Sequence, residues 1–228
     1  TFTLHKKWLT EFCDMYRREI GLPFMCNARV ETIDDDVIRV LKEAGCSSIQ
    51  YGVESGNEWV RSKILNRKHS NQKLKSAFAL NKKYDLKSFS FNIVGLPFET
   101  KAMMADTLKL NMELQADFGK CFYFYPFPGS RLYQMCADYG LLRNGLESLS
   151  GYLEGPALNE TFASHDDMRK YREQMEAFFY AKLLFSKIGI PPFIEKILMK
   201  GILHFSRPIN AVLAPTAKNP VITRLRGA

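Results

Sequence analysis

The chain has 228 residues, of which 46% are hydrophobic, and this is enough to bury a sizeable core as one large domain or one domain with an appendage. No stretch approaches the roughly 20 uninterrupted apolar residues that a membrane-spanning helix needs. The five well-separated cysteines argue against a disulfide scaffold and a local C-x-x-C metal loop, and favour a reducing cytoplasm. The net charge of +8 suits an anionic partner, but Lys and Arg occur throughout the chain, many beside acidic residues, as on a solvated surface.

Helices and strands are expected to alternate over the first 140 residues. Apolar residues at helical spacing predict a helix over 4–20, which Gly21 and Pro23 end. Four short apolar runs then predict strands at 24–30, 48–53, 89–94 and 121–125. Ser or Thr caps open the helices expected between and after them, at 32–45, from 55 onward, and at 70–84, 100–114 and 130–139. Parallel strands need crossovers of a dozen or more residues, so this spacing predicts a parallel α/β fold.

After residue 140 the alternation stops. Residues 141–162 are irregular, a helix is expected over 164–187, and a shorter one follows Pro191 and Pro192 and ends near Pro208. We therefore expect an α/β domain at 1–140, a helical region at 141–208 and a tail at 209–228. The apolar and basic residues around 193–207 fit two roles, a lid over the α/β domain and an amphipathic helix in peripheral contact with a membrane.

The unusual residues of this chain lie where the predicted strands end. Ligands of parallel α/β folds bind at these carboxyl ends. The second strand ends in GVESG (52–56), the third in NIVGLPFET (92–100), and the fourth leads into PFPGSRLY (126–133). Glycine beside a polar residue lets the backbone approach a ligand while a side chain hydrogen-bonds it.

In their order and spacing these three motifs resemble the later strands of the radical S-adenosylmethionine (SAM) enzymes. The resemblance covers residues 1–140 and points to the cobalamin-binding group that includes proteins like the anaerobic magnesium-protoporphyrin monomethyl ester cyclase. It implies the last four β/α units of a partial (β/α)6 barrel, followed by a helical C-terminal extension. It also implies an enzyme that, when intact, reductively cleaves SAM at a [4Fe–4S] cluster to start methylation, cyclisation or similar radical chemistry on an unknown organic substrate.

One departure from the family pattern concerns the cluster. The family's C-x-x-x-C-x-x-C loop, whose cysteines ligate the [4Fe–4S] cluster, is absent from this sequence. We therefore expect no metal ligands in this chain, an N-terminally truncated barrel, and no activity from the chain alone. A cobalamin domain, if the protein has one, would precede Thr1. The resemblance further implies an electron donor for the cluster, a small-molecule or lipid- or porphyrin-like substrate, and no nucleic acid.

The resemblance also assigns cofactor-binding roles to eight residues, while it leaves the catalytic residues unknown. Glu54 and Ser55 match the end of the strand that hydrogen-bonds the ribose or methionyl part of SAM. Helix-terminal roles are the alternative for both residues, Glu54 through the helix dipole and Ser55 as a cap. Ile93 and Gly95 match the adenine-contact motif, and they also fit a core Ile and a turn Gly.

The remaining matches are at the final strand and on arginines. Tyr125 and Pro126 match the strand whose backbone contacts the adenine edge, where the proline could serve only to fix the turn. Arg29 is a candidate to hold a carboxylate, with a salt bridge to a helix acid as the alternative, and Arg67 is a second, weaker carboxylate candidate. Among neighbouring residues, Asn27 shares the strand face of Arg29, Glu99 lies one place later than the family's glutamate, and His69 is expected at the surface or as a cap.

Two other classes of protein stay open. One is a different β/α-barrel enzyme with a phosphorylated substrate, which would need a glycine-rich phosphate turn at the last strand that this sequence lacks. The other is a non-catalytic binding or scaffold module on the same fold. A nucleic-acid binder of that kind should cluster basic and aromatic residues on one element.

Overall fold

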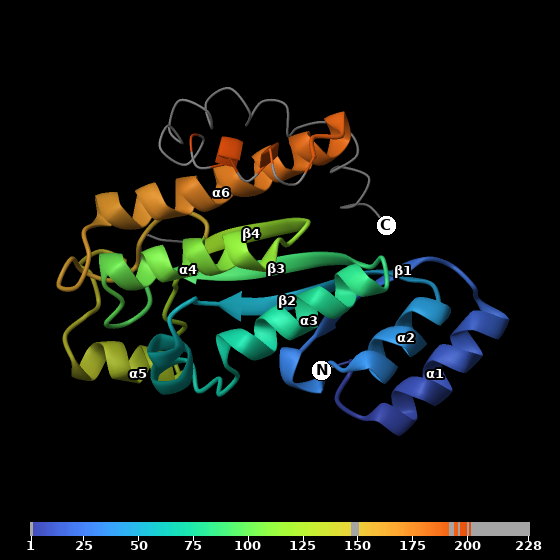
Figure 1. Ribbon diagram of the computed structural model, residues 1–228. Helices are drawn as coiled ribbons and strands as arrows, with labels where there is room; N and C mark the ends of the chain where they lie inside the picture. Colours follow the sequence, from blue (N-terminus) through green and yellow to red (C-terminus); the bar gives the residue numbers. More distant parts are fainter. Residues whose placement is uncertain (1, 147–150, 192–193, 196, 200, 202–228) are drawn as a thin grey trace.

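A four-stranded parallel sheet forms the centre of the molecule (Figure 1). The computed structural model describes residues 2–146, 151–191, 194–195, 197–199 and 201. The strands lie side by side in chain order, and they are β1 (Phe24–Ala28), β2 (Cys46–Glu54), β3 (Lys87–Val94) and β4 (Phe118–Tyr123). The prediction of a parallel α/β fold is confirmed.

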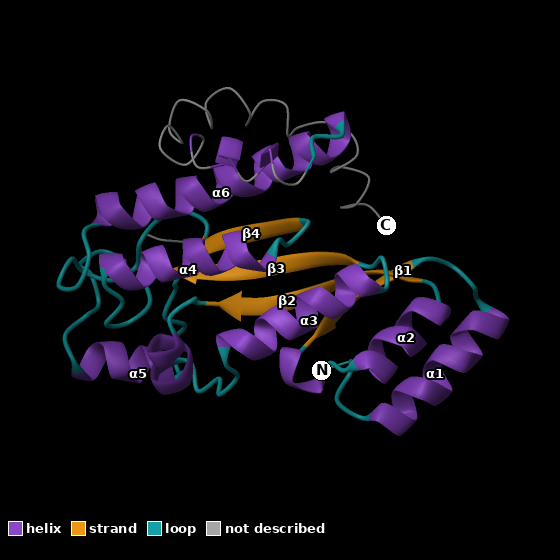
Figure 2. Ribbon diagram, viewed as in Figure 1, coloured by secondary structure: helices purple, strands orange, loops and turns teal. Residues whose placement is uncertain are grey.

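Helices flank the sheet, and three of them, one between each pair of consecutive strands, connect the strands (Figure 2). The helices are α1 (Lys6–Glu19), α2 (Asp35–Glu43), α3 (Asn71–Lys83), α4 (Lys101–Leu114), α5 (Arg131–Asp138) and α6 (His165–Ile188), with a short 3₁₀ turn at Val30–Thr32 and a π turn at Val60–Ile64. Most predicted bounds hold within a few residues. β4 begins three residues earlier than its apolar run indicated, because Phe118 and Gly119 already pair with Phe89 and Ser90 of β3.

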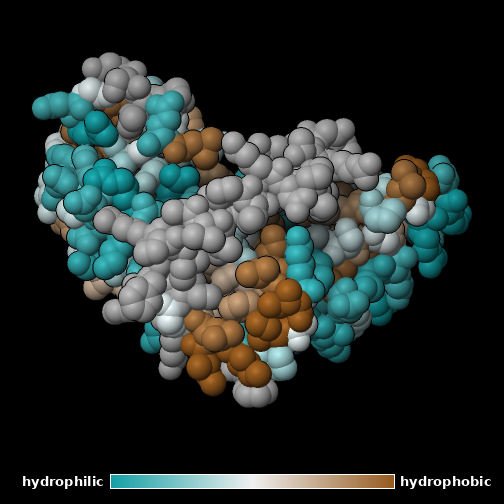
Figure 3. All heavy atoms as spheres, turned by 90° about the horizontal axis from the view of Figure 1, so that it is seen from above, coloured by the Kyte–Doolittle hydropathy of each residue, from teal (hydrophilic) through white to brown (hydrophobic). Residues whose placement is uncertain are grey.

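The long helix α6 packs on β4 and α4. The side chain of Phe179 fills the space beside Gly119 of β4, where even a Cβ atom would overlap its ring. Seen from above, on the side of α6, the largest group of hydrophobic side chains lies at the lower edge of the view, and smaller groups lie elsewhere (Figure 3). No helix within the described residues is long and apolar enough to cross a membrane. The predicted tail and the end of the predicted last helix lie outside the described residues.

Helix caps follow the sequence in four places and depart from it in two. Ser70, Thr100, Ser130 and Ser164 each accept a hydrogen bond from the amide three residues on. Thr32, however, lies in the 3₁₀ turn, and Asp34 caps α2 instead. At the second departure Asn57 accepts from the amides of Trp59 and Val60, in the place expected of Ser55. In each departure a second capping residue downstream, Asp or Asn, takes the role.

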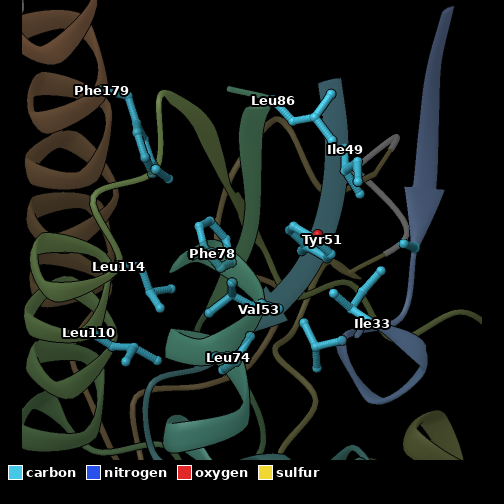
Figure 4. Packing of buried hydrophobic residues seen from close by; sticks show 14 of the residues in the cluster. Ile33, Ile49, Tyr51, Val53, Leu74, Phe78, Leu86, Leu110, Leu114 and Phe179 are labelled. Atoms are coloured by element: carbon cyan, nitrogen blue, oxygen red, sulfur yellow. The ribbon is translucent and has the colours of Figure 1, made fainter. Parts of the chain in front are cut away.

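The core lies between the sheet and its helices. Ile49, Tyr51 and Val53 alternate along β2 and are fully buried, and the ring of Tyr51 lies 5.0 Å from that of Phe78 of α3 (Figure 4). Figure 4 also shows Leu110 and Leu114 of α4 turned toward the same core. Burying such side chains contributes about 1.5–3 kcal/mol each. The face of the sheet that packs against the helices therefore contributes much of the stability of the fold.

The other face of the sheet is only partly covered. Alternate residues of β2 on this face, Gln50, Gly52 and Glu54, are partly exposed, as are Phe91 and Ile93 of β3. Successive side chains of a strand point to opposite faces of the sheet, so these residues alternate with the buried ones. This open face carries a large groove.

Candidate functional site

An open groove of about 1110 Å³ runs along the uncovered face of β1, β2 and β3. Its wall at the amino end of the strands is apolar and is built by Phe2, Phe12, Tyr16, Phe24 and Met25. At the carboxyl end the wall is polar, with Asn27, Arg29, Glu54, Asn66 and Arg67. A pocket with an apolar body and a few convergent polar groups is the usual form of a small-molecule site.

Glu54 is the acidic group of this groove. It ends β2 at a register shift, with a left-handed backbone (φ 65°) that is uncommon for a residue with a side chain. Its side chain is 14% exposed and turns back over Gly52, so that a Cβ at position 52 would overlap the carboxylate. Burial raises the pKa of Glu54, and the charge of Arg67 partly opposes this. The sequence signal for this contact was the glycine two residues before the strand-end glutamate, since a glycine within a strand can mark a close approach. This signal was not used to predict the site from the sequence.

Two arginines, Arg29 and Arg67, line the groove together with Glu54. A guanidinium nitrogen of Arg67 lies 3.2 Å from the Glu54 carboxylate, and the Arg67 side chain keeps 36% of its surface exposed. Arg29 is paired with Glu31 at 3.0 Å and is 46% exposed. For Arg29, a salt bridge to a nearby acid was the alternative that the sequence left open, and its pair with Glu31 is of that kind. Because each arginine has further donors, neither pairing prevents it from contacting a ligand in the groove.

Beneath these arginines lies a buried polar cluster that the sequence did not indicate. Arg61 is fully buried and donates to the backbone carbonyls of Ser55 at 2.5 Å and His69 at 3.2 Å. The His69 ring lies 3.3 Å from Glu31 and its side chain is 1% exposed, so its placement as a surface or capping residue was wrong. Burial lowers the pKa of His69. The cluster ties the loop after β2 to the end of β1, which carries Arg29.

Ser55 and Gly95 belong to a second buried cluster, built around Glu99. The Glu99 carboxylate accepts from the amides of Gly95 at 2.8 Å and Leu96 at 3.2 Å, and from the Ser55 hydroxyl at 3.4 Å. Glu99 is 1% exposed, and burial raises its pKa to about 7. It therefore closes the β3–α4 turn and links it to the end of β2. Ser55 and Gly95 do not line the groove, and their cofactor contacts stay predictions.

The other three predicted cofactor contacts lie along the same sheet edge, outside the groove lining. Ile93 is partly buried and packs beside Leu96 and Phe124. Tyr125 is partly exposed, with its ring 5.0 Å from that of Phe127, and Pro126 is buried. Of the eight predicted residues, Arg29, Glu54 and Arg67 thus line the groove together, whereas Ser55, Ile93, Gly95, Tyr125 and Pro126 do not line it.

The cysteines do not fit an iron–sulfur cluster. All five are free and buried, and they are spread over five elements, namely α1, β1, β2, β4 and α5. Burial raises the pKa of Cys13 and of Cys136 to about 11, which disfavours the thiolate that a metal needs. Within the described part of the chain no group of three His, Cys, Asp or Glu residues could hold a metal ion.

Comparisons with known proteins point to one superfamily. Residues 2–110 match the family model described as the Radical SAM superfamily. The chain is 27% identical over 143 residues to an uncharacterized methyltransferase of Pyrococcus horikoshii, which covers 62% of this chain and 31% of that protein. It is 27% identical over 139 residues to the anaerobic magnesium-protoporphyrin IX monomethyl ester cyclase of Rubrivivax gelatinosus, covering 60% of this chain and 25% of that protein.

Solved structures share the fold. The radical SAM methyltransferase TsrM of Kitasatospora setae superposes with a TM-score of 0.56 at 14% identity, over 74% of this chain and 35% of that one. Coproporphyrinogen III oxidase of Escherichia coli superposes with a TM-score of 0.50 at 22% identity, over 55% of this chain and 30% of that one. The chain therefore spans about a third or less of the length of these relatives.

Proposed function

We propose that this chain, whose residues 2–110 match the family model of the Radical SAM superfamily, is the SAM-binding part of an enzyme that reductively cleaves SAM at a [4Fe–4S] cluster. The observation that carries the proposal is the polar end of the groove. There a mostly buried carboxylate, Glu54, pairs with Arg67 and shares the groove with Arg29 at the carboxyl ends of parallel strands. This is the edge at which α/β folds bind ligands.

Each of these side chains has a defined task in the proposal. Glu54 accepts hydrogen bonds from the ribose hydroxyls of SAM, since a carboxylate can accept from two donors at once. Arg67 fixes the direction of that carboxylate through their 3.2 Å ion pair. Arg29 binds a carboxylate of SAM or of the substrate, and its planar guanidinium allows two parallel bonds. Glu99 acts indirectly, because it holds the turn that carries Gly95.

The cluster itself lies outside this chain in our proposal. The buried, dispersed cysteines do not fit it, and the relatives are three to four times as long as the matched region. A bound, reduced cluster would supply the one electron that cleaves a carbon–sulfur bond of SAM, and the products would be methionine and a 5′-deoxyadenosyl radical. The role of this chain is then to bind SAM, orient it and exclude water from the groove.

We propose a class of reaction and a class of substrate for the whole enzyme. The relatives include a methyltransferase and a cyclase, so methyl transfer and ring closure both suit an organic substrate of small-molecule, lipid-like or porphyrin-like type. A cobalamin cofactor would be held by another part of the protein, and a cytoplasmic electron donor would reduce the cluster. The five free thiols support a reducing compartment.

The proposal is tested with the protein that contains this chain, purified and reconstituted with iron and sulfide without oxygen. After reduction with dithionite, chromatography should detect 5′-deoxyadenosine and methionine formed from SAM in equal amounts. The isolated 228-residue chain, treated in the same way, should form neither. If the larger protein forms no 5′-deoxyadenosine and binds no SAM, a non-catalytic binding module on the same fold replaces the proposal.

A further inference from the structure

Glu31 is contacted from two sides, by an arginine of the groove and by a buried histidine. A guanidinium nitrogen of Arg29 donates to Oε1 of Glu31 at 3.0 Å, and Nδ1 of His69 lies 3.3 Å from the same oxygen. Burial opposes ionisation of Glu31, but hydrogen bonds from its own amide and from Arg29 outweigh this and lower its pKa. One ionised carboxylate therefore links the partly exposed Arg29 to a histidine in the interior.

The backbone that carries Glu31 is held firmly. Glu31 lies in the 3₁₀ turn after β1, between Val30 and Ile33, which are 2% and 1% exposed. Both the amide and the hydroxyl of Thr32 donate to the backbone carbonyl of Arg29, at 3.0 Å and 2.8 Å. The Glu31 carboxylate therefore starts from a backbone that the core and the turn fix in place.

The histidine at the other end of this link is fixed as well. The backbone carbonyl of His69 accepts from the fully buried Arg61 at 3.2 Å, and the carbonyl of Arg61 accepts from the amide of Arg67 at 2.8 Å. The loop after the π turn thus carries both Arg67, which pairs with Glu54, and His69, which meets Glu31. One loop therefore contacts the acid of the groove directly and Arg29 through a carboxylate.

We propose that Glu31 and His69 are positioning residues that hold the guanidinium of Arg29 toward the carboxylate of SAM. Neither residue lines the groove, so both act through Arg29. This role rests on the proposed function, in which Arg29 binds a carboxylate. An arginine side chain has many rotamers, and one that is already oriented loses less entropy when a ligand binds.

Glu31 also competes with a ligand for the charge of Arg29, and this effect is the weaker one. The ion pair is partly exposed, with 46% of the Arg29 side chain and 33% of the Glu31 side chain accessible, so solvent screens it. Glu31 contacts one guanidinium nitrogen, and the other donors of Arg29 stay available to a ligand. Loss of Glu31 should therefore weaken binding of SAM.

The first test follows the reaction of Arg29 with phenylglyoxal in the protein that contains this chain, with modified peptides quantified by mass spectrometry. Glu31→Gln should raise the rate at Arg29 about threefold or more, because the ion pair that shields the guanidinium is lost. His69→Leu, which releases Glu31 on its inner side, should raise the rate about twofold. His69→Asn keeps an amide donor near the position of Nδ1, so its rate should lie closer to that of the wild type. The control Glu43→Gln removes a partly exposed carboxylate of α2 that pairs with Arg39, and it should not change the rate at Arg29.

The second test measures the KM for SAM in the formation of 5′-deoxyadenosine. Glu31→Gln should raise this KM about threefold and leave kcat unchanged, as expected when an interaction that serves binding is lost. In the Arg29→Gln background the same replacement should cause no further rise, because its effect passes through Arg29. Glu43→Gln should again match the wild type.

Each test has results that would overturn the inference. The first test does so if Arg29 reacts at the wild-type rate in Glu31→Gln or in His69→Leu. The second does so if the KM falls or stays the same in Glu31→Gln, or rises equally in the Arg29→Gln background, which would show a general structural role. If the wild type neither binds SAM nor forms 5′-deoxyadenosine, the proposed function fails, whereas the reactivity of Arg29 still decides whether Glu31 and His69 hold it. Unchanged far-UV circular dichroism verifies that the variants fold.

Discussion

The carboxylate of Glu54 lies over Gly52, two residues earlier on the same strand, in the space that a side chain at position 52 would occupy. The left-handed backbone of Glu54 and the register shift between these residues bring the carboxylate back along β2, where Arg67 meets it. The position of the acid in the groove therefore depends on the absence of a Cβ at residue 52. A side chain added at position 52 should therefore displace the Glu54 carboxylate and weaken ligand binding, while it leaves the free energy of unfolding nearly unchanged.

Gly52→Ala should weaken SAM binding and leave the fold nearly intact. The new methyl group meets only the flexible end of the Glu54 side chain, which can move aside, so the free energy of unfolding should change by less than about 1 kcal/mol. The displaced carboxylate loses a hydrogen bond to the ligand, which corresponds to a KM for SAM raised about fivefold or more. The control is Gly155→Ala, where no atom lies within 4 Å of the added Cβ. Equal KM values for Gly52→Ala and the wild type would contradict this account of Glu54.

Gly56→Ala should instead destabilise the protein. A Cβ at this position would overlap the backbone carbonyl of Asp106 in α4, which cannot move aside as a side chain can. Overpacking of this kind costs about 1–3 kcal/mol in the free energy of unfolding. Urea unfolding of Gly56→Ala beside Gly155→Ala measures the difference. A loss equal to that of the control would mean that α4 does not hold the loop after β2 as closely as the structure has it.

Glu99 should make stability depend on pH in the direction opposite to an ordinary carboxyl. Its pKa is raised from 4.5 to about 7 by burial, so the folded protein binds a proton that the unfolded chain releases between these values. The free energy of unfolding should therefore fall as pH rises from 4.5 to 7, by roughly 3 kcal/mol from this group. Glu99→Gln should abolish this slope, whereas Glu11→Gln, on an exposed part of α1, should keep it. Urea unfolding at a series of pH values gives the slopes, and an unchanged slope in Glu99→Gln would show that the carboxyl is ionised in the fold.

His69 should contribute a slope of the opposite sign. Burial lowers its pKa, so the unfolded chain gains a proton more readily than the fold does, and stability from this group falls as pH drops below about 6.5. Comparing Glu99→Gln with Glu99→Gln/His69→Gln isolates this effect from that of Glu99. The single exposed replacement His5→Gln in the same background is the control. If the double variant is no less sensitive to acid than Glu99→Gln, the His69 ring is not buried as the structure has it.

The sequence predicted the fold and part of the site for physical reasons that differ between residues. Caps such as Thr100 and Ser164 depend on local hydrogen bonds, and they were predictable. The place of Glu54 at a strand end was predictable as well, because carboxyl ends of parallel strands share one edge. Its backward turn over Gly52 was not, since that turn follows from the register shift between β2 and β3.

The buried charged residues could not be predicted from sequence. Arg61 and His69 are types that usually lie at the surface, and they are buried here because loops after β1 and β2 close over them. The contact of Ser55 could not be predicted either, because its hydroxyl donates to Glu99, a residue 44 positions away in the sequence. Contacts of this kind are set by how the chain packs.

The measurement that tests the central claim most directly is the KM for SAM in the formation of 5′-deoxyadenosine by the protein that contains this chain. It should be compared between the wild type, Glu54→Gln and the exposed control Glu11→Gln. If Glu54 accepts hydrogen bonds from SAM, Glu54→Gln should raise this KM about tenfold while Glu11→Gln leaves it unchanged. An unaltered KM in Glu54→Gln would contradict the assignment of the groove as the SAM site.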